Sequence, residues 1–297
     1  MSAVASIPRT SRVSIFVRGR SARRYAPLTS LLLVLPLFVT FAIGFLYPVA
    51  MLVDLSFSTG LAPYRRLVEE SLYLDVLGTT VVTAGAVALL CLLLGYPVAY
   101  AMARRGGKAA LITAACVLIP LWTSVLIRSY AWIVLLQRNG IVNTLLQASG
   151  LSDGPLTLLY TQGAVILAMT HVLLPFAILP IHSTLRMLPA DLTRAAANLG
   201  AGPVRAFLSV TLPLSLPGVF AGAVLCFVLA LGFYITPALV GGPGSMLMAT
   251  LIGQQTTVVL DWPFAAALST VLLAITLLIV LASQRVVALS KGFSNGH

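Results

Sequence analysis

Residues 186–212 read RMLPADLTRAAANLGAGPVRAFLSVTL, and this segment predicts two short helices joined by a sharp turn. Asp191 is a suitable N-cap for the first helix, because its carboxylate can accept a hydrogen bond from the first turn. Gly200 stands where a helix can end in the left-handed conformation, and Pro203 suits the first turn of a second helix. One face of the first helix carries Leu192, Ala195, Ala196 and Leu199. We therefore expect a helix–glycine–helix elbow that another protein can approach closely, although such an elbow taken alone could also be a packed connector.

The sequence on both sides of the elbow is too apolar for a soluble protein. Apolar residues make up 59% of the 297 residues and charged residues only 8%, whereas soluble domains contain about a quarter charged residues. This composition excludes a soluble domain, a disordered chain, a coiled coil and a secreted disulfide scaffold. Charge-free stretches cover residues 25–53, 76–103, 109–127, 154–185, 206–260 and 262–284. We expect an all-α integral membrane protein.

Six membrane spans are expected, because a spanning helix needs about 20 apolar residues. The segment 237–245 contains three glycines and two prolines, which predicts a break after one span within the longest stretch. The first span follows six arginines but is too long for a signal-peptide core, so it should remain as an anchor. Cys91, Cys116 and Cys226 lie inside expected spans and are interpreted as packing residues. The spans cover approximately 30–53, 77–103, 109–130, 161–185, 213–236 and 264–284.

The distribution of charge predicts the orientation of the chain. The two terminal tails, the loop 104–108 and the elbow hold fourteen basic residues and one acidic residue, whereas the intervening segments hold four basic and six acidic residues. The positive-inside rule therefore places both termini in the cytoplasm, and it accounts for the net charge of +11 without nucleic acid. The expected organisation is a basic cytoplasmic tail over 1–29, a first transmembrane helix over 30–53, a five-helix core over 76–284 and a cytoplasmic tail over 285–297.

The sequence contains no pattern that is typical of an enzyme, a metal site or an ion-coupled transporter. None of the expected spans contains an aspartate or glutamate, although ion-coupled transporters and proton pumps need such groups inside the membrane. The chain lacks the motifs of zinc proteases, serine hydrolases and zinc sites, and Gly106-Gly107-Lys108 does not fit the phosphate-binding loop of ATPases. We expect no catalytic residue, no metal and no cofactor, so any ATP that drives transport must be hydrolysed by another subunit.

The elbow resembles the sequence motif of type I ABC importer permeases. That motif has Glu-Ala-Ala, three residues, Gly, and later an apolar residue and Leu-Pro. Here Arg194-Ala195-Ala196 is followed by Gly200, then by Leu212-Pro213 and by Pro217-Gly218. Arg194 departs from the usual glutamate, which leaves the alanine and glycine geometry intact but puts the contacts of that glutamate in doubt. The resemblance implies the type I permease fold with six transmembrane helices and both termini in the cytoplasm.

The resemblance extends over most of residues 30–290 to the spermidine/putrescine-type permeases. The segments that carry it are 120–132, which begins Pro-Leu-Trp, 233–243, which ends Gly-Gly-Pro, and 261–267, which begins Asp-Trp-Pro. It implies a multi-pass subunit of the bacterial inner membrane that works with a cytosolic ABC ATPase dimer, a second homologous permease subunit and an extracytoplasmic solute-binding protein. It also implies a small solute of the polyamine class as substrate. The residues implied in coupling to the ATPase are Asp191, Arg194, Ala195, Ala196, Leu199, Gly200, Phe207 and Pro213.

The candidate translocation path is drawn from residues in the outer half of the expected spans. Aromatic faces there can pass an ammonium group by cation–π attraction, but the same residues also fit an interfacial belt. Arg128 is expected to extend to the interface in a positional role, and His171 either bonds to a neighbouring helix or lines the path. With no buried acid, selectivity should come mainly from the binding protein. The candidates are Trp122, Arg128, Tyr130, His171 and Tyr234.

Two other functional classes are compatible with the span pattern alone. A secondary transporter or channel acting by itself is the alternative function, and an intramembrane enzyme is the third. Uptake that follows an ion gradient without ATP would indicate the former, and activity of the isolated chain on a lipid or peptide would indicate the latter.

Overall fold

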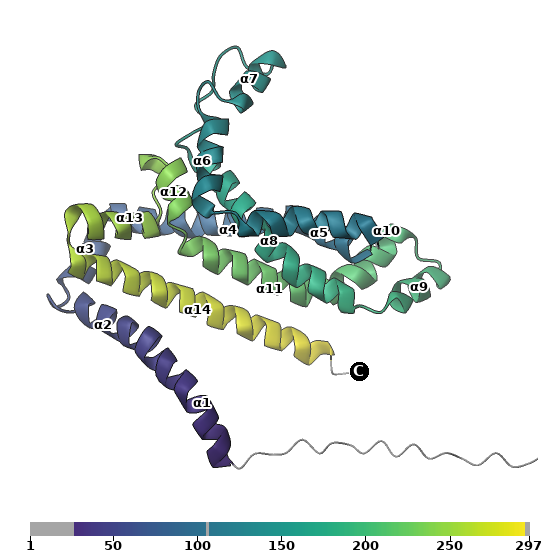
Figure 1. Cartoon of the computed structure of the whole chain (residues 1–297), viewed down its shortest axis with the longest axis horizontal. Coiled ribbons are helices and arrows are strands. Elements are labelled where there is room, and N and C mark those ends of the chain that lie inside the picture. Colours follow the sequence, from purple (N-terminus) through teal and green to yellow (C-terminus); the bar gives the residue numbers. More distant parts are fainter. Residues whose placement is uncertain (1–26, 105–106, 295–297) are drawn as a thin grey trace, which may run out of the picture. The chain divides into compact units, whose positions relative to one another are not determined.

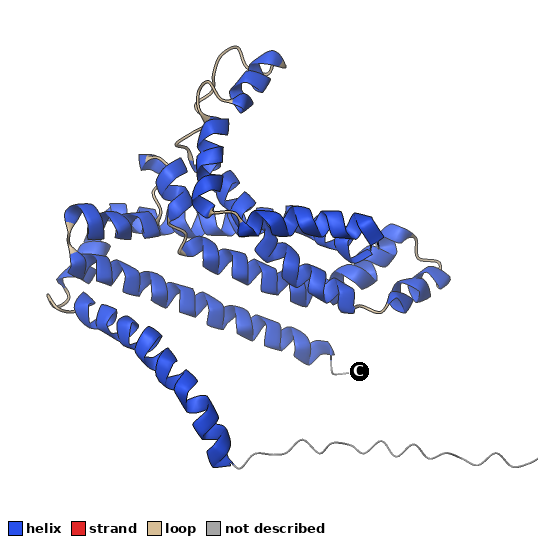
Figure 2. Cartoon of the chain, viewed as in Figure 1, coloured by secondary structure: helices blue, strands red, loops and turns tan. Residues whose placement is uncertain are grey.

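The computed structural model describes residues 27–104 and 107–294, and every regular element in these ranges is a helix (Figure 2). The chain divides into two units, Met1–Ala50 and Met51–His297. Helix α1 (Pro27–Phe41) continues through the π-helical turn η1 (Ala42–Leu46) into α2 (Tyr47–Ser56), and the boundary between the two units falls within α2. The all-α prediction is confirmed within the described ranges. Residues 1–26 of the expected N-terminal tail lie outside them.

The second unit contains the rest of the helices (Figure 1). Its five longest helices are α4 (Ser71–Arg104), α5 (Gly107–Trp122), α8 (Gln162–Met187), α11 (Leu212–Leu231) and α14 (Trp262–Ser294). The shorter elements are α3 (Ala62–Glu69), α6 (Val125–Leu136), α7 (Ile141–Ala148), α9 (Ala190–Asn198), α10 (Pro203–Ala206), η2 (Phe207–Thr211), α12 (Ile235–Val240), η3 (Pro243–Ser245), α13 (Met248–Gln254) and η4 (Gln255–Val259).

The number of spans depends on how one bent pair is counted. Five helical segments of the described chain are long and apolar enough to cross a membrane, and the pair formed by α5 with α6–α7 makes a sixth if it is one span. The prediction of a straight third span over 109–130 is wrong beyond Trp122, where the helix axis bends by 100°. Thr123 causes this stop, since both its N–H and its hydroxyl bond to the carbonyl of Pro120, at 3.2 and 2.7 Å.

Two other boundaries differ from the predicted ones. The helical run that contains the fifth span begins at Pro203 rather than near residue 213, so the second arm of the elbow is continuous with the span. The last helix continues to Ser294, so most of the expected C-terminal tail is helical, and residues 295–297 lie outside the described part. The segment 237–245, expected as a break, contains the end of α12 and all of η3, and α13 and η4 follow it. Helix α13 is anchored by a buried bond of 2.8 Å from the N–H of Met248 to the hydroxyl of Thr80 on α4.

The core of the second unit is the contact between α4, α8 and α11. Cys91 on α4 and Cys226 on α11 are both buried there, and their thiols donate to the carbonyls of Thr170 and Leu173 on α8 at 3.6 Å. These two cysteines are packing residues as predicted. Cys116 is not, because it lies on an exposed side of α5.

Glycines on α11 set the distance to α8. A Cβ atom at Gly218 would meet the hydroxyl oxygen of Thr184 at 2.5 Å and the carbonyl of Pro180 at 2.8 Å, and one at Gly222 would meet the backbone of Ala177 at 3.1 Å. Close backbone approach through small residues is the usual way in which membrane helices pack, because lipid supplies no hydrophobic force between them.

The variant Gly218→Ala should therefore force α8 and α11 apart. We expect a loss of about 1–3 kcal/mol of stability, as for other overpacked interfaces, measured as a lower midpoint of thermal unfolding in detergent. Gly85→Ala on α4 is the matched control, since a Cβ there meets nothing within 4 Å. Equal midpoints for the two variants would contradict this account of the α8–α11 contact.

Candidate functional site

The elbow has the geometry that its sequence predicts. Helix α9 ends at Asn198, Leu199 is its C-cap, and Gly200 adopts a φ of +82°. The N–H of Gly200 donates to Ala197 O at 2.9 Å and the N–H of Ala201 to Ala196 O at 3.0 Å, which is the Schellman pattern of a helix end. Pro203 then begins α10. The carbonyls at the end of α9 are therefore satisfied within the elbow itself.

Asp191 does not have the predicted role. The N-cap of α9 is Pro189, and Asp191 lies in the first turn. There its negative charge is attracted to the positive end of the helix dipole. Its Oδ1 accepts from Nη1 of Arg194 at 3.4 Å, and both side chains are largely exposed. The arginine that replaces the usual glutamate thus forms a local ion pair, which contributes at most about 0.5 kcal/mol at such an exposed position.

Large apolar side chains are exposed at the elbow beside its charged ones. Leu199 is 89% exposed. The other exposed apolar side chains of this end are Met187, Leu192, Val204 and Leu208. We call these five residues the elbow surface. Apolar side chains gathered at one exposed place commonly mark a contact with another protein.

The inner side of the elbow packs on α4. The ring of Phe207, the first residue of η2, contacts the rings of Tyr96 and Tyr100 edge to face, with centroids 5.8 and 5.5 Å apart. Arg104 donates to the hydroxyl of Thr193 on α9 at 3.5 Å and to that of Thr211, the last residue of η2, at 3.4 Å. The hydroxyls of Tyr96 and Ser215 share a bond of 2.8 Å. We call the contact of Tyr96, Tyr100 and Arg104 with the elbow the α4 junction.

The sequence analysis predicts a role for Phe207 but misses the three residues of α4 that contact it. Because Tyr96, Tyr100 and Arg104 are four positions apart, they lie on one face of a helix. This shared face is the sequence signal from which they could have been identified. Pro213 follows directly after the π-helical turn, where Leu212 N–H donates to Phe207 O. The wider turn accommodates a residue that has no N–H to donate.

The candidate path residues do not form one cluster. Trp122 is 90% exposed at the end of α5, and the side chains of Tyr130 and Tyr234 are about half exposed. Tyr234 is held against α13, since a Cβ at Gly253 would meet its ring at 2.5 Å. His171 is exposed on α8 and its Nδ1 accepts a bond of 3.2 Å from Trp132 Nε1. This pair agrees with the interpretation of His171 as bonded to a neighbouring helix.

The expected position of Arg128 is wrong. Its side chain does not extend to an interface but is only 9% exposed. The bend after Trp122 turns α6 so that Nη2 of Arg128 lies 3.4 Å from the carbonyl of Thr123. The neighbouring Ser129 joins α6 to α12 through a buried bond of 2.9 Å to Thr236. Arg128 therefore belongs to the packed base of α6.

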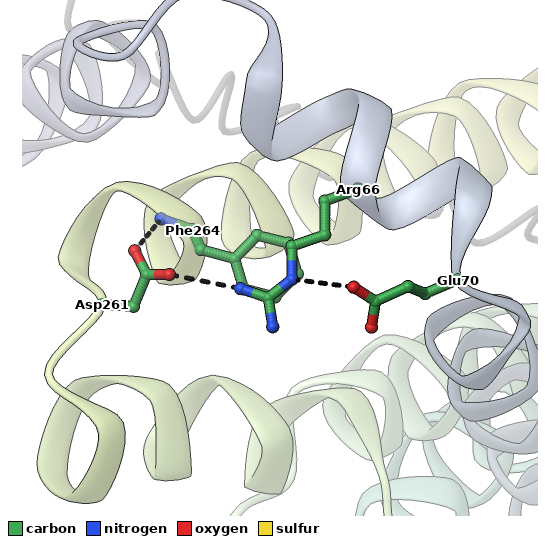
Figure 3. A network of polar contacts seen from close by, with 4 residues as sticks. All are labelled: Arg66, Glu70, Asp261 and Phe264. Atoms are coloured by element: carbon green, nitrogen blue, oxygen red, sulfur yellow. Dashed lines mark hydrogen bonds and ion pairs between the residues drawn. The ribbon is translucent and has the colours of Figure 1, made fainter.

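A polar network lies at the end of α4 opposite the elbow (Figures 1 and 3). Arg66 on α3 pairs with Glu70 at 3.1 Å and with Asp261 at 3.4 Å, and its guanidinium carbon lies 4.4 Å from the ring centroid of Phe264. Asp261 also accepts from the N–H of Phe264 at 3.2 Å and so caps α14. Partial burial lowers the pKa of Arg66, but the bond to Glu70 and the nearby carboxylates outweigh it, so the pKa lies above its ordinary value. Arg66 remains charged and fastens α3 to the start of α14.

The comparisons with known proteins agree with this architecture. The family model described as "Binding-protein-dependent transport system inner membrane component" matches residues 92–290. The chain belongs to this family. It is a permease subunit of an ABC importer, a multi-pass component of the inner membrane, and not an enzyme. Membership also excludes the alternative of a transporter that acts alone.

Individual relatives differ in their cargo. The chain is 34% identical to the spermidine/putrescine transport system permease protein PotB of Escherichia coli K12 over 225 residues, which cover 75% of this chain and 82% of the relative. It is 34% identical to the molybdenum transport system permease protein ModB of Mycobacterium bovis, over 68% of this chain and 75% of the relative. A chain in the crystal structure of a bacterial alginate ABC transporter has the same fold, with a TM-score of 0.69, 20% identity and coverage of 86% and 92%.

The two neighbouring arginines of α3 offer a test of the polar network. Arg66→Ala should cost about 1–2 kcal/mol, because it removes two ion pairs and the contact with Phe264. Arg65→Ala should cost less than about 0.5 kcal/mol, because its ion pair with Glu69 is exposed. Thermal unfolding of both variants in detergent measures the difference, and equal losses would show that the network does not fasten α3.

Proposed function

We propose that this permease imports polyamines that an extracytoplasmic binding protein delivers. A separate ATPase that binds the elbow drives the transport. The proposal assigns the elbow end of the molecule to the cytoplasm, in agreement with the excess of basic residues in the tails, the 104–108 loop and the elbow. In this orientation the core over 76–284 forms one half of the translocation path. Residues 1–29 and 285–297 are then the cytoplasmic tails.

The observation that carries the coupling role is the conformation of Gly200. The Schellman end holds α9 at a fixed angle to α10, and α10 is continuous with the span over 203–231. A contact that displaces α9 therefore moves a membrane helix instead of being absorbed by a flexible loop. The elbow surface supplies the apolar contact for a cleft in an ATPase subunit. We assign this role to Asp191, Arg194, Ala195, Ala196, Leu199, Gly200, Phe207 and Pro213.

A second homologous permease subunit is proposed to complete the path. Large apolar side chains of α4, including Val82, Leu89 and Leu93, remain more than half exposed although α4 is the central helix of the core. In a membrane, lipid covers some of these apolar side chains. His171 is a polar group exposed on α8, and a polar group is costly against lipid. A protein partner or a water-filled path on this side of α8 removes that cost.

The polyamine class rests on the relationship to PotB and on the surface of the candidate path. The rings of Trp122, Tyr130 and Tyr234 are exposed there, and such rings attract an ammonium group weakly and let it pass. Arg128 is covered by its neighbours, so its charge does not face an arriving cation directly. We assign selectivity to the binding protein, because no aspartate or glutamate lies among these path residues.

The elbow is tested by two valine variants in the same turn. Gly200→Val should leave the subunit in the membrane but abolish substrate-stimulated ATP hydrolysis, because a β-branched residue at a φ of +82° costs about 1–3 kcal/mol and displaces α9. Gly202→Val is the control, because Gly202 has an ordinary φ of −63° and a Cβ there meets nothing within 4 Å. Coupling that survives in Gly200→Val would refute the assignment of the elbow.

The substrate is tested by uptake competition in cells that depend on this importer. Excess unlabelled spermidine should abolish uptake of labelled putrescine, whereas molybdate should leave it unchanged. Vanadate, which inhibits ABC ATPases, should abolish uptake as well. Specific uptake of molybdate instead of putrescine would replace the polyamine class by an oxyanion.

A further inference from the structure

The elbow is joined by the peptide chain to only two of the three core helices. Its first arm follows α8, and its second arm continues through η2 into α11. Helix α4 is remote in sequence from the elbow, yet it packs against both α8 and α11 along the core. A displacement of the elbow that moved α8 and α11 alone would break the close packing of α4. The core can move as a body only if α4 is also held at the elbow end.

The α4 junction supplies this third attachment. It holds η2 at both of its ends, since Phe207 is the first residue of this turn and Thr211 the last. Arg104 also reaches Thr193 on α9, so one guanidinium contacts both arms of the elbow. The planar fork of an arginine has donors for two acceptors at a fixed angle, which a lysine cannot reproduce.

The α4 junction contacts the helical run between α10 and α11 at its π-helical turn. A π turn is a local register change in a helix and commonly marks a functional position. Without contacts to a neighbouring helix, a change in the shape of η2 could absorb a displacement of the elbow before it reaches α11. The edge-to-face contacts of Phe207 with Tyr96 and Tyr100 brace the turn against α4.

We infer that Tyr96, Tyr100 and Arg104 are positioning residues that transmit the movement of the elbow to α4 during transport. The inference rests on the proposed coupling role of the elbow. In this inference, the movement of the elbow reaches α4 through side-chain contacts, whereas it reaches α8 and α11 through the backbone. The inferred role of the three residues is exerted through their contacts with Phe207, Thr193 and Thr211.

The test measures solute imported per ATP hydrolysed in the assembled importer, reconstituted with its ATPase and binding protein. Phe207→Ala and Arg104→Gln should each retain copurification of the ATPase but lower this ratio about fivefold or more, in the range of ordinary coupling between sites. Lys108→Gln is the control for loss of a positive charge near the end of α4.

Interaction between the two parts of the junction gives a second readout. Tyr100→Leu combined with Phe207→Ala should lower the ratio by less than the two separate losses combined, because both variants break the contact between these two rings. Tyr100→Leu also removes the contact of the Arg104 guanidinium with the Tyr100 ring, whose centroid lies 5.5 Å away. Arg104→Gln keeps the test decisive if Phe207→Ala fails to fold, because Arg104 is exposed and contributes little to the core.

The results separate this inference from the proposed function. An unchanged ratio of solute to ATP in assembled Arg104→Gln would overturn the inference alone, and so would losses explained entirely by reduced amounts of protein in the membrane. Failure of the unmodified chain to copurify with any ATPase would overturn the proposed coupling role, and the inference with it.

Discussion

The close contact between α8 and α11 at Gly218 and Gly222 is the constraint on which the position of the elbow depends. The two arms of the elbow are the continuations of these helices, so the distance between the helices fixes the distance between the arms. A side chain at Gly218 would meet both Thr184 and Pro180. The Schellman end at Gly200 then fixes the angle of α9. A backbone contact inside the membrane and a turn outside it together give one defined surface.

Sequence reasoning succeeds where a local rule applies. The left-handed glycine, the proline at the start of α10 and five of the apolar spans each follow from residues close together in the chain and are present in the structure. The N-cap role of Asp191 also follows from a local rule, but Pro189 has that position. The elbow motif could therefore be placed correctly before any contact was known. Family membership followed from the same segment, since its alanines and glycines have both the spacing and the geometry that the motif requires.

The errors and omissions arise where the outcome depends on distant or competing contacts. Thr123 ends α5 by bonding back to Pro120, although the hydropathy of the following residues is that of a span. Arg66 and Asp261 are separated by 195 positions, and no local pattern pairs them. Arg128 is charged and was expected at an interface, but the bend after Trp122 buries it. Tyr96 and Tyr100 share a helix face, yet only the fold shows that Phe207 fills it.

The positions of the three cysteines have a practical consequence for spectroscopy. Cys91 and Cys226 are enclosed in the core, whereas Cys116 is exposed on α5. A membrane-permeant thiol reagent therefore reaches one natural attachment point on the folded chain, and a fluorophore or spin label can be introduced at Cys116 without replacing any other residue. Because α5 ends at the sharp bend, a label there reports on the helix whose shape departs most from the simple span pattern.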